Sequence, residues 1–236
     1  MLLAYQGEKM SALIDKFINL FKWPVAVYMV ILLPAIFASI DFFNFRTSRF
    51  LFFVGGLAVF AFSKTIGDAA LRVHLQTLIH ELTHSFWALL TFHKVKQIKL
   101  NDDISGGGMV FQGEGNWLII IAPYFFPLVC FFYMIFMSLW LKFWPYHFVL
   151  TCIFGYLVGL HLDTVCSQIH EKQTDLPKVS YPFCWTFLPG ANLLVVGSLF
   201  AYNSMGWHGI KTYFILVNQL TIRNFLDLYQ AALNLL

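Results

Sequence analysis

One pentapeptide in the chain combines two metal-binding side chains with an acid. His80, Glu81 and His84 form the pattern HExxH in His80-Glu81-Leu82-Thr83-His84. On a helix, the i, i+4 spacing puts both imidazoles on one face, where their nitrogens can share a Zn²⁺ ion. Glu81 lies one position further round and is placed to take a proton from an attacking water. The pattern therefore predicts a zinc site with hydrolytic chemistry.

The pentapeptide lies inside a largely apolar helical stretch, from Ala69 to Phe92. An ionisable residue at membrane depth costs ~2.5–3.5 kcal/mol on insertion scales, so three of them within five positions need a compensating partner. A bound metal ion supplies that partner. The competing interpretation is a hydrogen-bonded polar patch between packed helices.

The composition excludes an ordinary soluble domain. Of 236 residues, 59% are hydrophobic and 11% are charged, against roughly 25% charged in soluble proteins. Three runs without Asp, Glu, Lys or Arg match or exceed the ~20 residues that cross a bilayer core. They are Gly115–Leu141, Phe143–Leu162 and Val179–Ile210. We predict an all-α polytopic membrane protein, because a barrel would show short alternating segments instead.

Net charge and cysteine content exclude two further classes of protein, namely nucleic-acid-binding proteins and disulfide-stabilised domains. The net charge is +3 and the basic residues are scattered, so we expect the lipid bilayer as a partner and no nucleic acid. The four cysteines fall in or beside apolar segments, without a CxxC pair. They are typical of thiols packed in a membrane and not of a disulfide framework.

We expect a single membrane-embedded domain over residues 1–236, with about six transmembrane helices and a small β-hairpin. Its expected parts are an interfacial amphipathic helix (1–23), N-terminal helices ending in the HExxH helix (24–92), the hairpin (93–116), C-terminal catalytic helices (117–202) and a C-terminal helix (203–236). Pro123 and Pro127 predict a kink in the first of the catalytic helices. The apolar piece Phe50–Ser63 is short for a crossing unless it tilts, extends through Lys64, or re-enters.

The hairpin is expected where the character of the chain changes from apolar to polar and glycine-rich. Apolar residues of Val95–Leu100 precede a turn at Asn101–Gly108, and Met109–Phe111 follows it. This arrangement predicts two short strands at the membrane surface, because the segment is too polar to span lipid.

An HExxH pattern in a membrane helix, followed by a short hairpin, two further crossings and an acidic residue, resembles the site-2 protease family of intramembrane zinc metalloproteases. The similarity is to the short, membrane-only members and covers about Ala69 to Gly197. It implies that His80 and His84 hold zinc with a downstream aspartate, and that Glu81 activates the water.

Two aspartates are candidates for the third ligand, because the family's usual Leu-Asp-Gly or Asn-Pro-Asp-Gly signature is absent. Asp163 lies near the end of an apolar helix at a depth that could match the histidines, or it pairs with His161 or Lys172. Asp175 lies just before the next crossing, like the family aspartate, or it is a plain loop or N-cap residue. Both stay open, and the position before a crossing slightly favours Asp175.

These features predict a zinc endopeptidase that cleaves peptide bonds within or near the transmembrane segments of membrane-protein substrates. A helix hides its own peptide bonds, so the substrate must unwind. The hairpin can then hold it by strand addition at Met109, Val110 and Phe111, with Gly106–Gly108 as a movable element.

A rival function uses the same polar residues without hydrolysis. A membrane transporter, or a proton or metal relay, could be formed by a chain of ionisable side chains: His80, Glu81, His84, His161 and Asp163. For either function we expect a multi-pass protein of a bacterial inner (cytoplasmic) membrane in preference to an organelle membrane.

Overall fold

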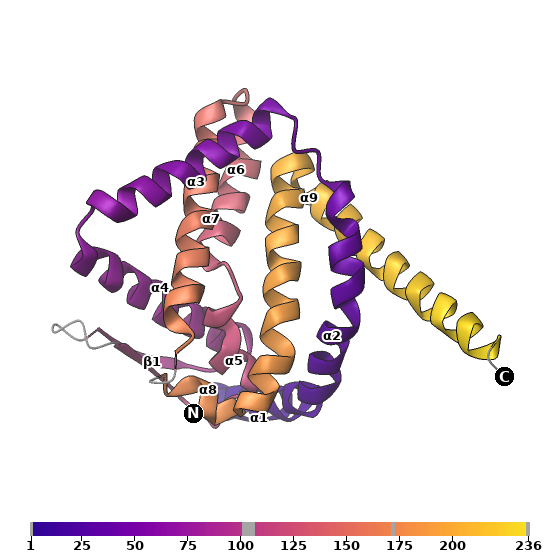
Figure 1. The fold of residues 1–236 in the computed structure, drawn as a ribbon. Helices are drawn as coiled ribbons and strands as arrows, with labels where there is room; N and C mark the ends of the chain where they lie inside the picture. Colours follow the sequence, from indigo (N-terminus) through magenta and orange to yellow (C-terminus); the bar gives the residue numbers. More distant parts are fainter. Residues whose placement is uncertain (1, 101–106, 171–172, 235–236) are drawn as a thin grey trace.

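The computed structural model describes residues 2–100, 107–170 and 173–234, with side chains from Gly7 onward. The chain folds into a helical bundle with an antiparallel hairpin after the fourth helix (Figure 1), which confirms the predicted architecture. The elements in chain order are α1 (Leu2–Leu20), α2 (Lys22–Ala38), η1 (Ser39–Phe42), α3 (Ser48–Ile66), α4 (Ala69–Leu90), β1 (Val95–Leu100), β2 (Gly107–Phe111), α5 (Trp117–Ile121), η2 (Ala122–Tyr124), α6 (Leu128–Phe143), α7 (Phe148–Gln168), α8 (Asp175–Val179) and α9 (Tyr181–Leu233).

Several of these helices could cross a membrane. Within the described part of the chain, four are long and apolar enough: α2 with η1, α3, α7 and α9. A fifth crossing results if Trp117–Tyr124 and Leu128–Phe143 count as one span, bent by 78°. The bend lies between Pro123 in η2 and Pro127 at the start of α6, where the two prolines predict it. The molecule is therefore an integral, multi-pass membrane protein.

Helix α4, which carries the HExxH pentapeptide, is not among these candidate spans. Its 22 residues are long enough, but Arg72, Glu81 and the histidines lower its mean hydropathy. Figure 1 shows α4 running obliquely to α7 and α9. The apolar pattern of α4 predicts a further crossing, so the sequence favours about six spans, whereas the described part of the chain has four or five candidates.

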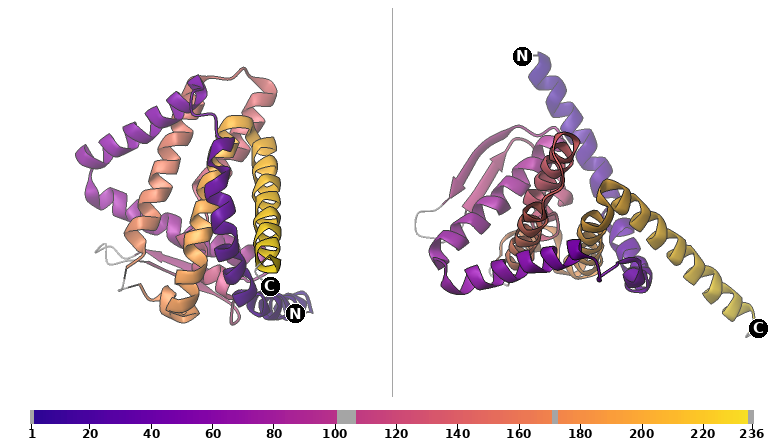
Figure 2. Two further views of the ribbon diagram at one scale, coloured as in Figure 1. Left: turned by 45° about the vertical axis from the view of Figure 1, so that its right-hand side comes forward. Right: turned by 90° about the horizontal axis from the view of Figure 1, so that it is seen from above.

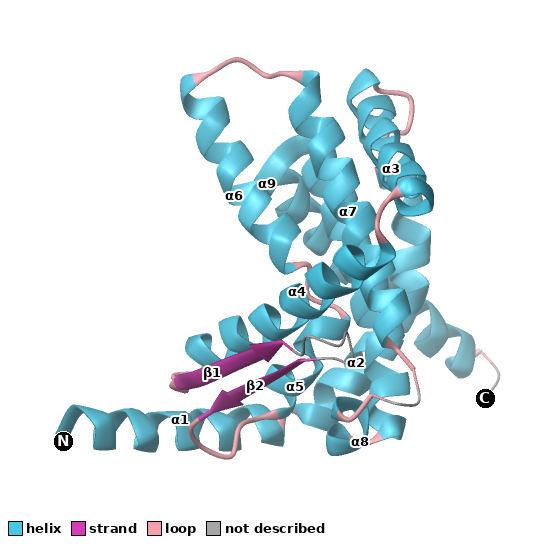
Figure 3. Ribbon diagram, turned by 90° about the vertical axis from the view of Figure 1, so that its left-hand side faces the viewer, coloured by secondary structure: helices cyan, strands magenta, loops and turns pink. Residues whose placement is uncertain are grey.

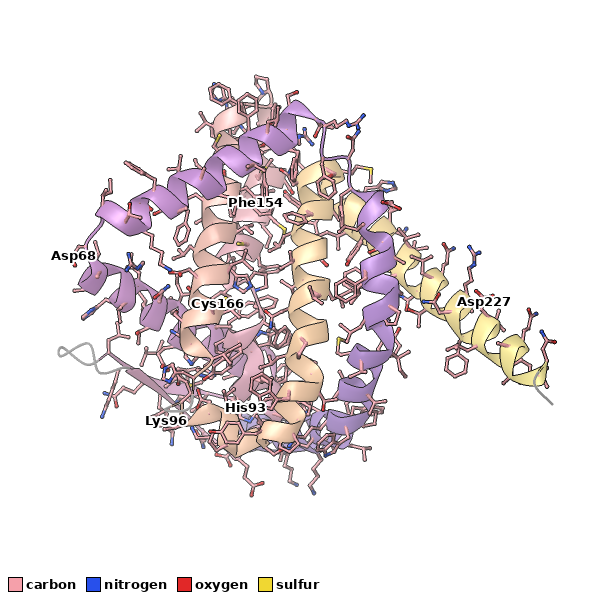
Figure 4. The ribbon with its side chains drawn as sticks, viewed as in Figure 1. Asp68, His93, Lys96, Phe154, Cys166 and Asp227 are labelled. Carbon is pink, nitrogen blue, oxygen red and sulfur yellow. The ribbon has the colours of Figure 1, made fainter. Side chains whose placement is uncertain are left out.

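Two glycines let α3 and α7 touch backbone to backbone. A Cβ at Gly56 would lie 1.9 Å from the carbonyl oxygen of Cys152, and one at Gly155 would lie 2.0 Å from that of Phe53. Such small-residue contacts are typical of membrane helix pairs. Phe53 and Phe154 are fully buried beside the contact, and Figure 4 places Phe154 inside the bundle. The contact fixes α7, whose last residues reach the HExxH helix.

The long helix α9 is broken at Met205 and Gly206, where Gly206 has a φ of 63°. The break falls close to the boundary expected at residue 203. Helix α9 packs against α2 on both sides of this break, and its C-terminal end projects from the bundle in Figure 1 and in the right-hand view of Figure 2. Asp227, labelled in Figure 4, lies on this projecting part.

The hairpin pairs Leu100 with Gly107 and Val95 with Phe111, with a bulge between Val95 and Gln97. Figure 3 shows it lying beside α4 and α1. Residues 101–106 of the predicted turn are outside the described residues. The predicted strands are confirmed, and the hairpin forms one side of the site described next.

Helix α1 is held under the bundle by a buried polar cluster. Asp15 accepts hydrogen bonds from His93 (3.0 Å) and from Asn116 (2.7 Å), and all three residues are buried. Figure 4 places His93 at this lower end of the molecule. Leu13 and Phe17 of α1 remain exposed, in keeping with the predicted amphipathic helix.

Candidate metal centre

The two histidines of the pentapeptide meet at one point on α4. The helix begins at Asp68, whose side chain accepts from the backbone N–H groups of Ala70 (2.7 Å) and Leu71, a normal N-cap. One helical turn separates His80 from His84, and their Nε2 atoms lie 3.1 Å apart. Both histidines are buried. The helix therefore delivers two nitrogen donors to one buried location.

A carboxylate completes the group from a distant part of the chain. Oδ2 of Asp175 lies 3.4 Å from Nε2 of His80 and 3.1 Å from Nε2 of His84. Two ligands at a normal zinc distance and tetrahedral angle would lie about 3.3 Å apart. In the described part of the chain, these three residues are the His, Cys, Asp or Glu group that could hold a metal ion. We call them the His/His/Asp cluster.

The hydrogen bonds around His84 show which nitrogen is free for a metal. Nδ1 of His84 lies 2.7 Å from the carbonyl oxygen of Ile119. A carbonyl oxygen only accepts, so Nδ1 carries the proton, and in the neutral imidazole Nε2 carries the lone pair that a metal needs. Nε2 of His84 and Oδ2 of Asp175 lie 3.1 Å apart, so either a proton or a metal cation lies between them. A shared cation stabilises such an arrangement, and the donor set therefore fits a metal.

The carbonyl of Ile119 is positioned by the start of α5. Asn116 caps this helix by accepting from the N–H groups of Leu118 (3.1 Å) and Ile119 (3.2 Å). The amide of Asn116 in turn donates to Asp15 of α1. The orientation of His84 is therefore connected through α5 to the N-terminal helix.

Asp175, which the sequence leaves open as a ligand or as a plain loop or N-cap residue, begins the short helix α8. Its Oδ1 accepts from Lys178 (2.8 Å), and its Oδ2 is 3.4 Å from the hydroxyl of Tyr124. Burial alone would raise the pKa of the Asp175 carboxyl, but the interactions with His80, His84 and Lys178 outweigh burial and hold this pKa below its usual range. Asp175 is therefore an anion.

The cluster opens into a cavity of about 580 Å³. Its lining comes from α4, β2, α5, the end of α7 and α8. Exposed Thr174 and Lys178 are among the lining residues, so solvent reaches the cavity. Water, which hydrolysis requires, can therefore enter the site.

Glu81 lies between the histidines and the hairpin. It is buried and lines the cavity. A Cβ at Gly107 would lie 3.1 Å from Cγ of Glu81 and 3.0 Å from Cγ2 of Thr77. The backbone of β2 can pass directly over Glu81 because position 107 has no side chain.

The other candidate aspartate lies elsewhere. Asp163 forms an ion pair with Lys64 of α3 and accepts a hydrogen bond from Gln76 of α4 at 2.9 Å. The pairing with His161 considered in the sequence analysis is not found, since Nε2 of His161 has no partner among the described residues. Lys172, the other partner considered, lies outside them. The structure thus brings Asp175, and not Asp163, to the two histidines.

Three groups around the cluster are absent from the sequence-based predictions. Lys178 could have been found, because it is three residues after Asp175 and that spacing brings the two together on a helix. Tyr124 is hidden in an apolar run, and only its position between two prolines marks it. The carbonyl of Ile119 leaves no signal, because every residue has one.

Fold and site together define a multi-pass helical membrane protein with a metallopeptidase-type histidine and carboxylate cluster. Residues 53–162 match the family model described as Peptidase M50B-like, so this part of the chain is similar to the site-2-protease-like metallopeptidases. The match runs from α3 to near the end of α7, and so includes the HExxH pentapeptide but ends before Asp175. Searches of curated proteins and of solved structures give no significant match. The family resemblance predicted from the sequence is confirmed.

Proposed function

We propose that the protein is an intramembrane zinc metalloprotease that hydrolyses peptide bonds within or near the transmembrane segments of membrane proteins. The observation that carries the proposal is the convergence of His80, His84 and Asp175, with Nε2 of His84 and Oδ2 of Asp175 3.1 Å apart. These three residues would hold the ion. Zinc, when bound, polarises the scissile carbonyl and lowers the pKa of a water molecule toward ~7.

Glu81 serves as the general base in this proposal. Its carboxylate accepts the proton of the attacking water and passes it to the leaving amine. Two features support the role: Glu81 neighbours His80 in the chain, and it lines the same solvent-reached cavity.

Strand β2 is proposed to hold the unwound substrate. Gly107, Gly108, Met109 and Phe111 of this strand line the cavity, and in the described part of the sheet β1 is the neighbour of β2. The outer edge of β2 can therefore accept a further strand.

The direction of the backbone groups refines this role. The N–H of Gln112 donates to the carbonyl of Lys94 (3.0 Å), and successive N–H groups along a strand point to opposite edges. The N–H of Val110 therefore points to β1, whereas those of Met109 and Phe111 point to the outer edge. We assign substrate hydrogen bonds to Met109 and Phe111, and side-chain contact to the exposed Val110.

A paired measurement on Glu81→Gln tests the proposal. Zinc content and cleavage of a co-expressed membrane substrate are measured on the same preparation. The amide keeps the shape of the side chain but cannot accept the proton, so about one zinc per chain should remain while cleavage falls by about 10²-fold or more. His84→Ala is the control and should lose both zinc and cleavage.

The same measurement separates the rival function. Retained cleavage in Glu81→Gln would remove Glu81 from catalysis, and a zinc-free wild type would refute the metal assignment. Proton or metal transport that survives the substitution would favour a transporter. The structure gives the relay little support, because Asp163 is engaged by Lys64 and Gln76.

A further inference from the structure

Three buried polar atoms close to the His/His/Asp cluster lack a hydrogen-bond partner among the described residues. They are Nδ1 of His80, Nε2 of His161 and Oε1 of Gln168. An unsatisfied buried polar group costs about 1–3 kcal/mol, so three of them at one place point to contacts that form when the site is loaded.

The two histidines of the cluster differ in the hydrogen bonding of their Nδ1 atoms. Nδ1 of His84 donates to the carbonyl of Ile119, whereas Nδ1 of His80 has no such acceptor. A metal-binding histidine almost always donates its second ring N–H to a carbonyl, a carboxylate or a water, which fixes the tautomer and the ring orientation. His80 therefore needs an acceptor at Nδ1.

Helix α7 presents the two candidate acceptors. His161 and Gln168 are seven residues apart and so share one face of this helix. His161 and His80 line a void of about 10 Å³, and Gln168 and His80 line the main cavity. Gln168 also lies close enough to the His80 imidazole to influence it, although Nδ1 of His80 and Oε1 of Gln168 do not meet hydrogen-bond geometry.

Chemistry favours Gln168 over His161. An amide oxygen is always an acceptor, whereas Nε2 of His161 accepts only in one of its two neutral tautomers. The void beside His161 is at the lower limit for a single water molecule, about 10–15 Å³, so His161 would have to act through a water. Gln168 can act directly after a small side-chain adjustment.

We propose that Gln168 is a positioning residue whose Oε1 accepts the Nδ1–H of His80 and thereby holds the His80 ring with its Nε2 lone pair toward the metal. The inference rests on the proposed metal-binding function. It assigns to the last residue of α7 a part in forming the site, alongside α4 and α8.

Zinc affinity of the purified full-length protein tests the inference. A competing chelator is titrated against the wild type, Gln168→Leu and Gln168→Glu. Leucine keeps the volume but removes the acceptor, so affinity should fall by about 10- to 100-fold. Glutamate keeps an acceptor oxygen and should restore affinity to within a few-fold of the wild type.

Gln173→Leu is the matched control. Gln173 is the same residue type and lines the same cavity, but its side-chain contact is with His170 at 3.4 Å. Zinc affinity should not change in this variant. His161→Leu should also leave it unchanged.

A spectroscopic measurement distinguishes loss of the His80 ring position from general unfolding of the variant. With Co²⁺ in place of zinc, the N–H protons of the two ligand imidazoles give paramagnetically shifted, solvent-exchangeable proton resonances. Gln168→Leu should abolish or broaden the His80 signal and leave the His84 signal, because the acceptor for His84 is the Ile119 backbone. The surviving His84 signal shows that the variant is folded.

Three outcomes would overturn the role of Gln168, the exclusion of His161 or the proposed protease function. Wild-type affinity together with an unchanged His80 signal in Gln168→Leu would refute the role of Gln168. Loss of affinity in His161→Leu alone would transfer the role to His161. A wild type that binds zinc but cleaves no substrate would refute the proposed protease function only, because the affinities of the variants still test Gln168.

Discussion

Asp175 and Asp163 differ in what their carboxylates face. Asp175 faces two imidazole nitrogens and is steadied by Lys178, while Asp163 faces Lys64 and Gln76. Both carboxylates pair with a lysine, but of the two it is Asp175 whose second oxygen lies within 3.4 Å of both imidazole nitrogens. The residue environment therefore supports Asp175 as the third ligand.

Conversion of each aspartate to asparagine tests this assignment. A neutral amide is a poorer zinc ligand than a carboxylate, so Asp175→Asn should lose most of the bound zinc and Asp163→Asn should keep it. Elemental analysis after desalting measures the occupancy. The reverse ranking would make Asp163 the ligand, and full occupancy in both variants would point to a different third ligand.

Some residues of the metal site can be predicted from the sequence and others cannot, for a physical reason. His80, Glu81 and His84 are predictable because helical periodicity alone sets their relative positions. Asp175 stays undecided from sequence, because its distance to the histidines depends on how α8 docks 95 residues further along the chain. Gln168 and the Ile119 carbonyl depend on tertiary packing in the same way.

At the scale of elements, the α3–α7 contact depends on one of two adjacent glycines. A Cβ at Gly56 would strike the backbone of α7, whereas a Cβ at Gly55 meets nothing within 4 Å. Gly56→Ala should therefore destabilise the fold by about 1–3 kcal/mol through overpacking. Gly55→Ala should be neutral or stabilise by up to about 1 kcal/mol through helix propensity.

Denaturant titration in detergent micelles measures both alanine variants. Equal stability of the two would show that the α3–α7 contact is looser than the structure describes. Because α7 carries Gln168, Gly56→Ala should also lower zinc affinity, while Gly55→Ala should not.

A proline substitution in β2 tests whether the hairpin holds the substrate. Met109→Pro removes an N–H from the outer edge of β2, and the preceding Gly108 has no Cβ to clash with the proline ring. Cleavage should fall by about tenfold or more if each lost substrate hydrogen bond costs roughly 1.5 kcal/mol. Met109→Leu keeps the N–H and should shift substrate preference only modestly. Normal cleavage by a folded Met109→Pro variant would place the substrate elsewhere.

The elements themselves were predictable to different degrees. Long apolar runs predict the membrane helices, and paired prolines predict the bend before α6. Helix α8 was missed because five residues carry too little periodicity to be seen. The oblique course of α4 was missed too, because hydrophobic pattern predicts that a helix forms but not how it lies against its neighbours.

At the scale of the whole molecule, the site depends on contacts from both ends of the chain. Asp15 of α1 holds Asn116, Asn116 caps α5, and α5 supplies the carbonyl that orients His84. From the other side, α7 and α8 bring Gln168 and Asp175. Residues outside the matched family region are therefore part of the site, which explains why the site cannot be understood from the HExxH helix alone.

A metal bound by residues of α4 and α8 would act as a crosslink across the fold. Ligands that bind only the folded state stabilise it by RT ln(1 + [L]/Kd), about 2.7 kcal/mol at a hundredfold excess over Kd. Zinc removal by a chelator should therefore lower the thermal unfolding temperature of the wild type, and zinc addition should restore it. His84→Ala should start at the lower temperature and respond to neither treatment. A wild type that contains zinc but unfolds at the same temperature with and without chelator would show that the ion does not tie α8 to α4, and that the His/His/Asp cluster is not where it binds.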